Sequence, residues 1–139
     1  MTSMTYTNKD NLIDYFAYIQ KAGKLRTTSH AQRWSRAVLK TFGINLDRGT
    51  KKKLAKALPA DLADDLTRVF WLAHFQNSGL TQYDFLNQVS RRAGNSDPDF
   101  ARYPVTAVFH QLKAIIGPDM TNQVAKSLSP EMRQMWEEA

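Results

Sequence analysis

The chain has 139 residues, of which 42% are hydrophobic and 23% charged, values typical of one soluble globular domain. It contains no cysteine, which excludes disulfides, iron–sulfur clusters, thiolate zinc sites and cysteine nucleophiles. No apolar run approaches the roughly 20 residues of a membrane helix, and the polar N-terminal residues do not resemble a secretory signal. We therefore expect a cytoplasmic protein that does not enter a membrane.

Positive charge is concentrated in the first part of the chain. Residues 1–58 hold 12 Lys and Arg against 3 Asp, whereas residues 59–139 hold 7 Lys and Arg against 10 Asp and Glu. The formal net charge of the whole chain is +6. Such asymmetry indicates an acidic partner, nucleic acid included, or two halves or subunits that attract each other.

The apolar residues follow a helical spacing along almost the whole chain. In the first half this spacing predicts four helices, over about residues 9–22, 29–42, 50–57 and 59–76, the last of them ended by Asn77-Ser78-Gly79. Ser29 is the expected N-cap of the second helix and Gly43 its end, and Thr50 is the expected N-cap of the third. No run of strand length alternates apolar and polar residues, so the sequence predicts an all-α fold.

The same pattern starts again in the second half. Thr81 can cap a helix that Gly94 ends, and three further helices are expected to start at Asp97-Pro98, Gly117-Pro118 and Ser129-Pro130. Pro104 should kink its helix or separate a short turn ahead of it.

Placing each residue over the one 70 positions later aligns the two halves without a gap, and apolar positions and helix breakers coincide. We therefore predict two tandem four-helix repeats, residues 12–66 and 82–136, joined by a helix and turn over 67–81. One repeat alone would bury little surface, so both should pack as a single helical bundle domain spanning 1–139.

Several segments resemble a known family. The second half reads Phe85-Leu86-Asn87-Gln88-Val89-Ser90-Arg91-Arg92-Ala93-Gly94, then Ala107-Val108-Phe109-His110-Gln111-Leu112, then Val124-Ala125-Lys126-Ser127-Leu128. The first half matches in Arg36-Ala37-Val38-Leu39 and Leu54-Ala55-Lys56-Ala57-Leu58-Pro59-Ala60-Asp61-Leu62. Over about residues 12–136 the chain is similar to the bacterial "domain of unknown function 2267" family. The resemblance implies a small all-α bundle and brings no activity, cofactor or catalytic residue.

Catalytic and metal-binding patterns are missing from the sequence. His30, His74 and His110 fall in three different predicted helices, and no pair has the three- or four-residue spacing that a helical metal site needs. Asp61, Asp64 and Asp65 lie in the first turns of a helix, where they complement the helix dipole. No phosphate-binding glycine loop or nucleophile elbow occurs. We expect no enzyme, no metal, no cofactor and no small-molecule substrate.

The basic residues of the first half form the main candidate binding surface. They stand opposite the apolar stripe of the second helix and continue onto the third: Arg33, Arg36, Lys40, Lys51, Lys52, Lys53 and Lys56. A solvated cationic face is the plain interpretation. The same residues could also contact phosphates or an acidic protein.

A second candidate is the segment Phe70-Trp71-Leu72 with Phe75, which is apolar around the helix. Such a helix is normally buried on more than one side, here between the two repeats. Alternatively, Trp71 and Phe75 form an exposed hydrophobic anchor for a partner or a dimer.

The sequence leaves two candidate functions. The first is a non-enzymatic helical interaction module that binds a protein or itself. The second is binding of nucleic acid, through its phosphate backbone, by the basic N-terminal repeat.

Overall fold

The computed structural model describes residues 9–68 and 79–139, with side chains from Leu12 onward in the first range. These ranges contain helices and no strand, so the predicted all-α fold is confirmed. The helices are α1 (Lys9–Ala22), α2 (Thr28–Asn45), α3 (Arg48–Lys56), α4 (Ala60–Thr67), α5 (Gln82–Arg92), α6 (Pro98–Ser127) and α7 (Pro130–Glu138). None of these helices is long and apolar enough to cross a membrane.

Helix α2 differs from its prediction at both ends. Its N-cap is Thr27 rather than Ser29, and the Thr27 side chain accepts a hydrogen bond from the backbone N–H of His30. The helix also continues through Gly43 to Asn45. A Cβ at Gly43 would overlap the carbonyl oxygen of Leu66, so this glycine allows α2 and α4 to approach closely.

The cap predicted for α3 is also wrong. Asp47, not Thr50, is the N-cap, and its carboxylate accepts hydrogen bonds from the Thr50 backbone N–H at 2.8 Å and the Thr50 hydroxyl at 2.9 Å. The hydroxyl therefore helps to hold the capping carboxylate, and the helix begins ahead of Thr50, at Arg48.

Helix α6 consists of two helical segments that meet at Gly117. The backbone of Gly117 is non-helical, with a φ of 82°, which confirms the predicted new start at Gly117-Pro118. Of the two outcomes expected at Pro104, a kink or a separate turn, the separate turn is wrong, because the backbone stays helical through that residue. Pro104 is buried next to Gly23, where a Cβ would lie 3.2 Å from the Pro104 Cα.

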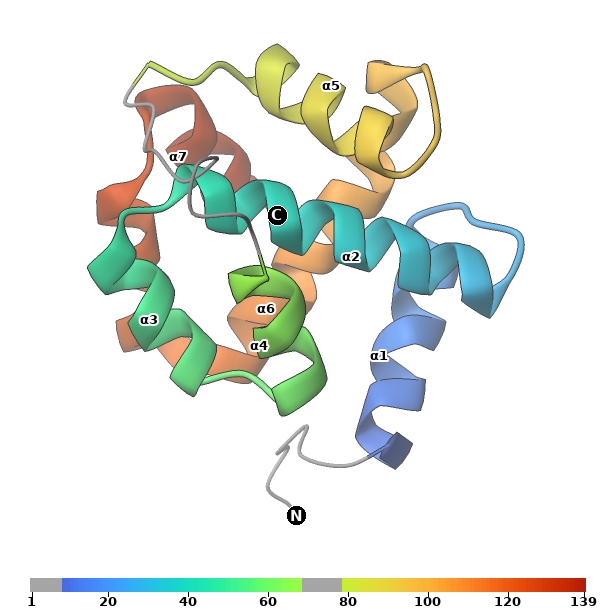
Figure 1. Ribbon diagram of the computed structural model, residues 1–139, viewed down its shortest axis with the longest axis horizontal. Coiled ribbons are helices and arrows are strands. Elements are labelled where there is room, and N and C mark those ends of the chain that lie inside the picture. The colour runs from blue at the N-terminus through green and yellow to red at the C-terminus, as the bar shows by residue number, and fades with distance from the viewer. Residues whose placement is uncertain (1–8, 69–78) are drawn as a thin grey trace.

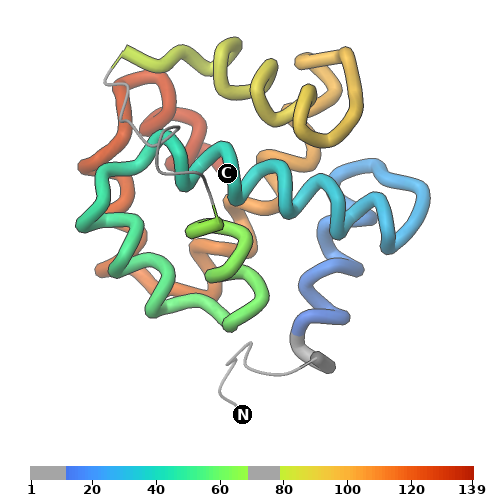
Figure 2. The backbone as a smooth tube through the Cα atoms, in the orientation of Figure 1, coloured from blue at the N-terminus to red at the C-terminus, as the bar shows by residue number. Residues whose placement is uncertain are grey.

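The helices of the two halves pack against each other. Figure 1 shows α2 crossing the molecule, with α5 on one side of it and α3 and α4 on the other. Helix α1 contacts both α2 and α6, and α5 likewise contacts both α6 and α2. Figure 2 follows the same path and shows the turns α1–α2 and α5–α6 at the same side of the molecule.

Four aromatic rings form the centre of the core, and all four are fully buried. Phe42 of α2 lies 5.0 Å from Phe109 of α6 and 5.5 Å from Trp136 of α7, measured between ring centroids. Phe85 of α5 lies 5.8 Å from Phe109. Because Phe42 comes from the first half of the sequence and the other three from the second, the core is shared between the halves rather than divided.

Candidate functional site

The seven predicted cationic residues lie on two helices. On α2, Arg33 and Arg36 are exposed and Lys40 is half-buried. On α3, Lys51 is half-buried, and the exposed side chains are those of Lys52, Lys53 and Lys56. Burial lowers the pKa of Lys51, and the charge of Arg48 lowers it further.

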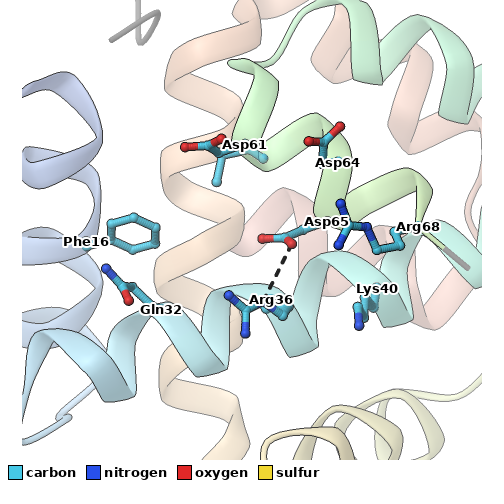
Figure 3. A pocket seen from close by; sticks show the side chains of 9 residues that line it. Phe16, Gln32, Arg36, Lys40, Asp61, Asp64, Asp65 and Arg68 are labelled. Atoms are coloured by element: carbon cyan, nitrogen blue, oxygen red, sulfur yellow. Dashed lines mark ion pairs between the residues drawn. The ribbon is translucent and has the colours of Figure 1, made fainter. Parts of the chain in front are cut away.

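A groove between α1 and α4 contains two of these cations. This α1–α4 groove has a volume of about 610 Å³ and lies over the exposed side of α2 (Figure 3). The residues that line it come from α1, α2 and α4 and from the residue that follows α4: Phe16, Gln32, Arg36, Lys40, Asp61, Leu62, Asp64, Asp65 and Arg68. Arg33 and the α3 lysines do not line it. The structure thus divides the predicted basic surface.

Cations and carboxylates face each other across the α1–α4 groove. The Arg36 Nε lies 3.6 Å from a carboxylate oxygen of Asp65 (Figure 3). Burial raises the pKa of Asp65, while the charges of Arg36, Lys40 and Arg68 act in the opposite direction. A carboxylate that is half withdrawn from water beside three cations neutralises part of the basic surface.

A buried polar pair fixes one wall of the groove. The hydroxyls of Tyr15 on α1 and Ser35 on α2 are hydrogen-bonded at 2.8 Å, and both side chains are buried. Burial raises the pKa of the Tyr15 phenol strongly. Since the chain neighbours of these two residues, Phe16 and Arg36, both line the groove, the bond sets the position of α1 relative to α2 there.

The sequence shows which residues are present in this groove, but it does not show how they are arranged. Its patterns assign Asp61, Asp64 and Asp65 to the dipole of their own helix. No spacing signal joins Arg36 to Asp65, because they meet only after α2 and α4 pack. No pattern singles out Arg68, which follows the last residue of α4.

The groove carries charged side chains without a recognisable catalytic arrangement. Within residues 9–68 and 79–139, no three His, Asp or Glu side chains are grouped so that they could hold a metal ion. Trp71 and Phe75, the candidate hydrophobic interface, lie outside the described residues, as does most of the linking segment 67–81. The fourth predicted helix is too long, because α4 ends at Thr67 and the backbone of Arg68 is not helical.

The fold and the groove define an all-α helical bundle with a mixed-charge surface groove. A family model described as "Uncharacterized conserved protein (DUF2267)" matches residues 14–135. The chain therefore belongs to this family, which confirms the resemblance seen in the sequence. None of the curated proteins matches the chain.

Proposed function

We propose that this protein is a non-enzymatic interaction module that binds a segment of a protein partner in the α1–α4 groove. The observation that carries the proposal is the mixed lining of the groove, with Arg36, Lys40 and Arg68 facing three aspartates beside the partly buried apolar ring of Phe16. A protein segment can offer both charges and an apolar side chain at once. A partner recognised in this way gains specificity from charge complementarity.

The same lining disfavours a nucleic-acid backbone in this groove. A phosphate approaching Arg36 would meet Asp65, already paired with it, and would pass Asp61 and Asp64. Like charges at such distances repel, and the existing ion pair would have to break. A phosphate that binds basic residues outside the groove does not incur this electrostatic cost.

Nucleic-acid binding is the second candidate, through the α3 part of the basic surface. Exposure of Lys52, Lys53 and Lys56 favours it. Engaging these side chains with duplex phosphates would lower log K by about 0.9 per contact for each unit of log salt. A titration of labelled DNA and RNA in about 50 mM salt tests this, with the triple variant Lys51→Gln, Lys52→Gln, Lys53→Gln expected to flatten the slope.

We also propose that the bundle is built from two tandem four-helix repeats. The helix bounds support this. Helices α2, α3 and α4 begin at residues 28, 48 and 60, and the residues 70 positions later also begin helical segments. These are residue 98 at the start of α6, residue 118 after Gly117, and residue 130 at the start of α7. A backbone contact between two helices of the first half has a different counterpart in the second half. Gly43 packs on the carbonyl of Leu66, whereas Lys113, the matching residue of the second half, donates a hydrogen bond to the carbonyl of Trp136 at 2.8 Å.

Site-specific photo-crosslinking tests the groove proposal. A photoreactive amino acid at Gln32, an exposed groove residue, should crosslink a protein partner, and the same group at exposed Asn122 on α6 is the matched control. The partner should be lost from the Gln32 position when Asp61 and Asp64 are both changed to Lys. Equal yields from Gln32 and Asn122, or yields unaffected by the aspartate changes, would contradict the proposal.

A further inference from the structure

A second cavity lies between the two halves of the chain, away from the α1–α4 groove. This inter-turn cleft has a volume of about 310 Å³ and is formed by the turn from α1 to α2 and the turn from α5 to α6. Both turns lie at the same side of the molecule (Figure 2). The volume is at the lower end of the range for small-molecule sites.

The lining of the inter-turn cleft carries positive charge from one half of the chain. Lys24, Arg26 and Arg33 are exposed and His30 is half-buried, and no Asp or Glu of the described residues lines the cleft. Within the part of the chain that the structure describes, the ion pair is Arg36–Asp65, so neither Arg26 nor Arg33 is neutralised by a described carboxylate. Such a cluster attracts an anion with more than one negative charge.

Aromatic side chains lie beside these cations. Trp34 and Phe100 both line the cleft, and their ring centroids are 5.7 Å apart. Phe100 is also 5.9 Å from Tyr103, whose ring lies under the Lys24 ammonium at 4.1 Å. Because Trp34 is almost fully buried and Phe100 half-buried, they offer an apolar floor rather than a free stacking face.

The backbone at Lys24 is an unusual place for a lysine. Its φ is 58°, and among the described residues it is the one non-glycine residue with a positive φ. Gly94, the matching residue of the second half, has a φ of 77°, in the region that glycine adopts without penalty. Residues held in such a conformation cost free energy and occur preferentially at functional sites. The chain keeps a cationic side chain here although the backbone favours glycine.

We propose that the inter-turn cleft binds a phosphate monoester that carries an aromatic group, the chemistry of a nucleotide. Arginine and lysine side chains contact the phosphate, since guanidinium groups bind phosphate oxygens in pairs. The aromatic group rests on the floor formed by Trp34 and Phe100. An inorganic anion would leave this floor uncovered, and an uncharged aromatic compound would leave Arg26 and Arg33 without an anionic partner. The proposal is independent of the partner in the α1–α4 groove.

Calorimetry with three probes tests this site: adenosine monophosphate, adenosine and inorganic phosphate. Adenosine monophosphate should bind at least about tenfold more tightly than either fragment, because charged hydrogen bonds and apolar contact both contribute. A short single-stranded oligonucleotide is the fourth probe. It distinguishes a free nucleotide from a nucleic-acid chain as the source of the phosphate, according to which of the two binds more tightly.

Two variants and one control locate the binding. Lys24→Gly and Arg33→Gln should each weaken adenosine monophosphate binding about tenfold, while Lys126→Gln, which removes an equal charge from an exposed position of α6, should not. Lys24→Gly should also unfold at the same temperature as the wild type or higher, because glycine relieves the backbone conformation. A loss of binding in a protein of undiminished stability would exclude a folding defect.

Three results would overturn the proposal. The first is that neither adenosine monophosphate nor the oligonucleotide binds at about 1 mM. The second is that adenosine binds as tightly as its monophosphate. The third is that Lys24→Gly and Arg33→Gln leave the affinity for adenosine monophosphate unchanged.

Discussion

Two residues in the core form a polar pair where the residues 70 positions later are apolar. Tyr15 and Ser35 form a buried hydrogen bond, whereas the matching positions of the second half hold Phe85 and Val105, which are apolar and buried. A buried polar pair is tolerated because each hydroxyl has the other as a hydrogen-bond partner. Since the apolar alternative is present in the same molecule, the pair can be tested against it.

The Tyr15–Ser35 pair should behave as a coupled unit. Tyr15→Phe leaves the Ser35 hydroxyl without its partner, and Ser35→Ala leaves the Tyr15 hydroxyl buried alone, so each change should lower the free energy of unfolding by about 1–3 kcal/mol. The double variant should cost about 1 kcal/mol less than the sum of the two. Urea unfolding of the four proteins measures this. Strictly additive costs would show that the hydrogen bond contributes nothing.

Asp47 provides a pH-dependent contribution at the start of α3. The hydrogen bond from the Thr50 backbone N–H is the main cause of its lowered pKa. Its stabilisation is therefore fully present above the ordinary pKa of 3.8 and is lost as the pH falls through the lower pKa of the folded state.

Replacing the cap should reveal this dependence. Asp47→Ala should lower the free energy of unfolding by about 1 kcal/mol at pH 7, and this difference from the wild type should shrink as the cap carboxylate is protonated. Asp47→Asn, which retains an acceptor oxygen, is the control and should lose little at pH 7. Denaturant unfolding at pH 7 and near pH 2.5 measures the two differences. An undiminished cost in acid would contradict the assigned role.

At the scale of helices, the sequence predicts most segments but not all of their ends. Apolar spacing and proline starts locate each described helix, including the break before Pro118. The start of α2 is ambiguous because Thr27, Thr28 and Ser29 can all cap a helix, so local chemistry does not choose among them. Gly43 has the local signature of a helix end, although its role depends on a contact with α4 that no local pattern reveals.

Two glycines inside helices should respond in opposite ways to alanine. Gly43→Ala should lower the free energy of unfolding by about 1–3 kcal/mol, because its Cβ would overlap the backbone carbonyl of Leu66. Gly49→Ala in α3 should stabilise the protein by about 0.5–1 kcal/mol, since its Cβ would meet only an Asp47 oxygen, at 3.5 Å. Thermal and urea unfolding compare them. A harmless Gly43→Ala would mean that α2 and α4 are not in close contact.

Helices from the two halves of the chain pack against each other throughout the described part of the molecule. Helix α1 packs on α6, α5 packs on α2, and the ring of Phe42 lies among the rings of Phe109 and Trp136. The small size of one repeat predicts this mutual packing from the sequence. The α1–α4 groove could not be predicted, because its shape depends on how α1 and α4 are placed over α2.

Separate halves should therefore fail to fold alone. Peptides 1–73 and 74–139 should each show weak helical circular dichroism and no cooperative thermal transition, because the apolar faces that pack across the halves would be exposed. Mixing the two should restore helicity if the interface is as extensive as the contacts indicate. A cooperative transition in either peptide alone would show that a repeat is an independent domain.

We propose that a protein segment occupies the mixed-charge α1–α4 groove. The most direct measurement is the affinity of the purified partner, identified by crosslinking from Gln32, for three forms of this protein. Changing Asp61 and Asp64 to Lys should weaken binding at least about tenfold relative to wild type, whereas changing Lys52 and Lys53 to Gln should leave it unchanged. The reverse result, in which only the change of Lys52 and Lys53 to Gln abolishes binding, would move the interface to α3 and contradict the proposal.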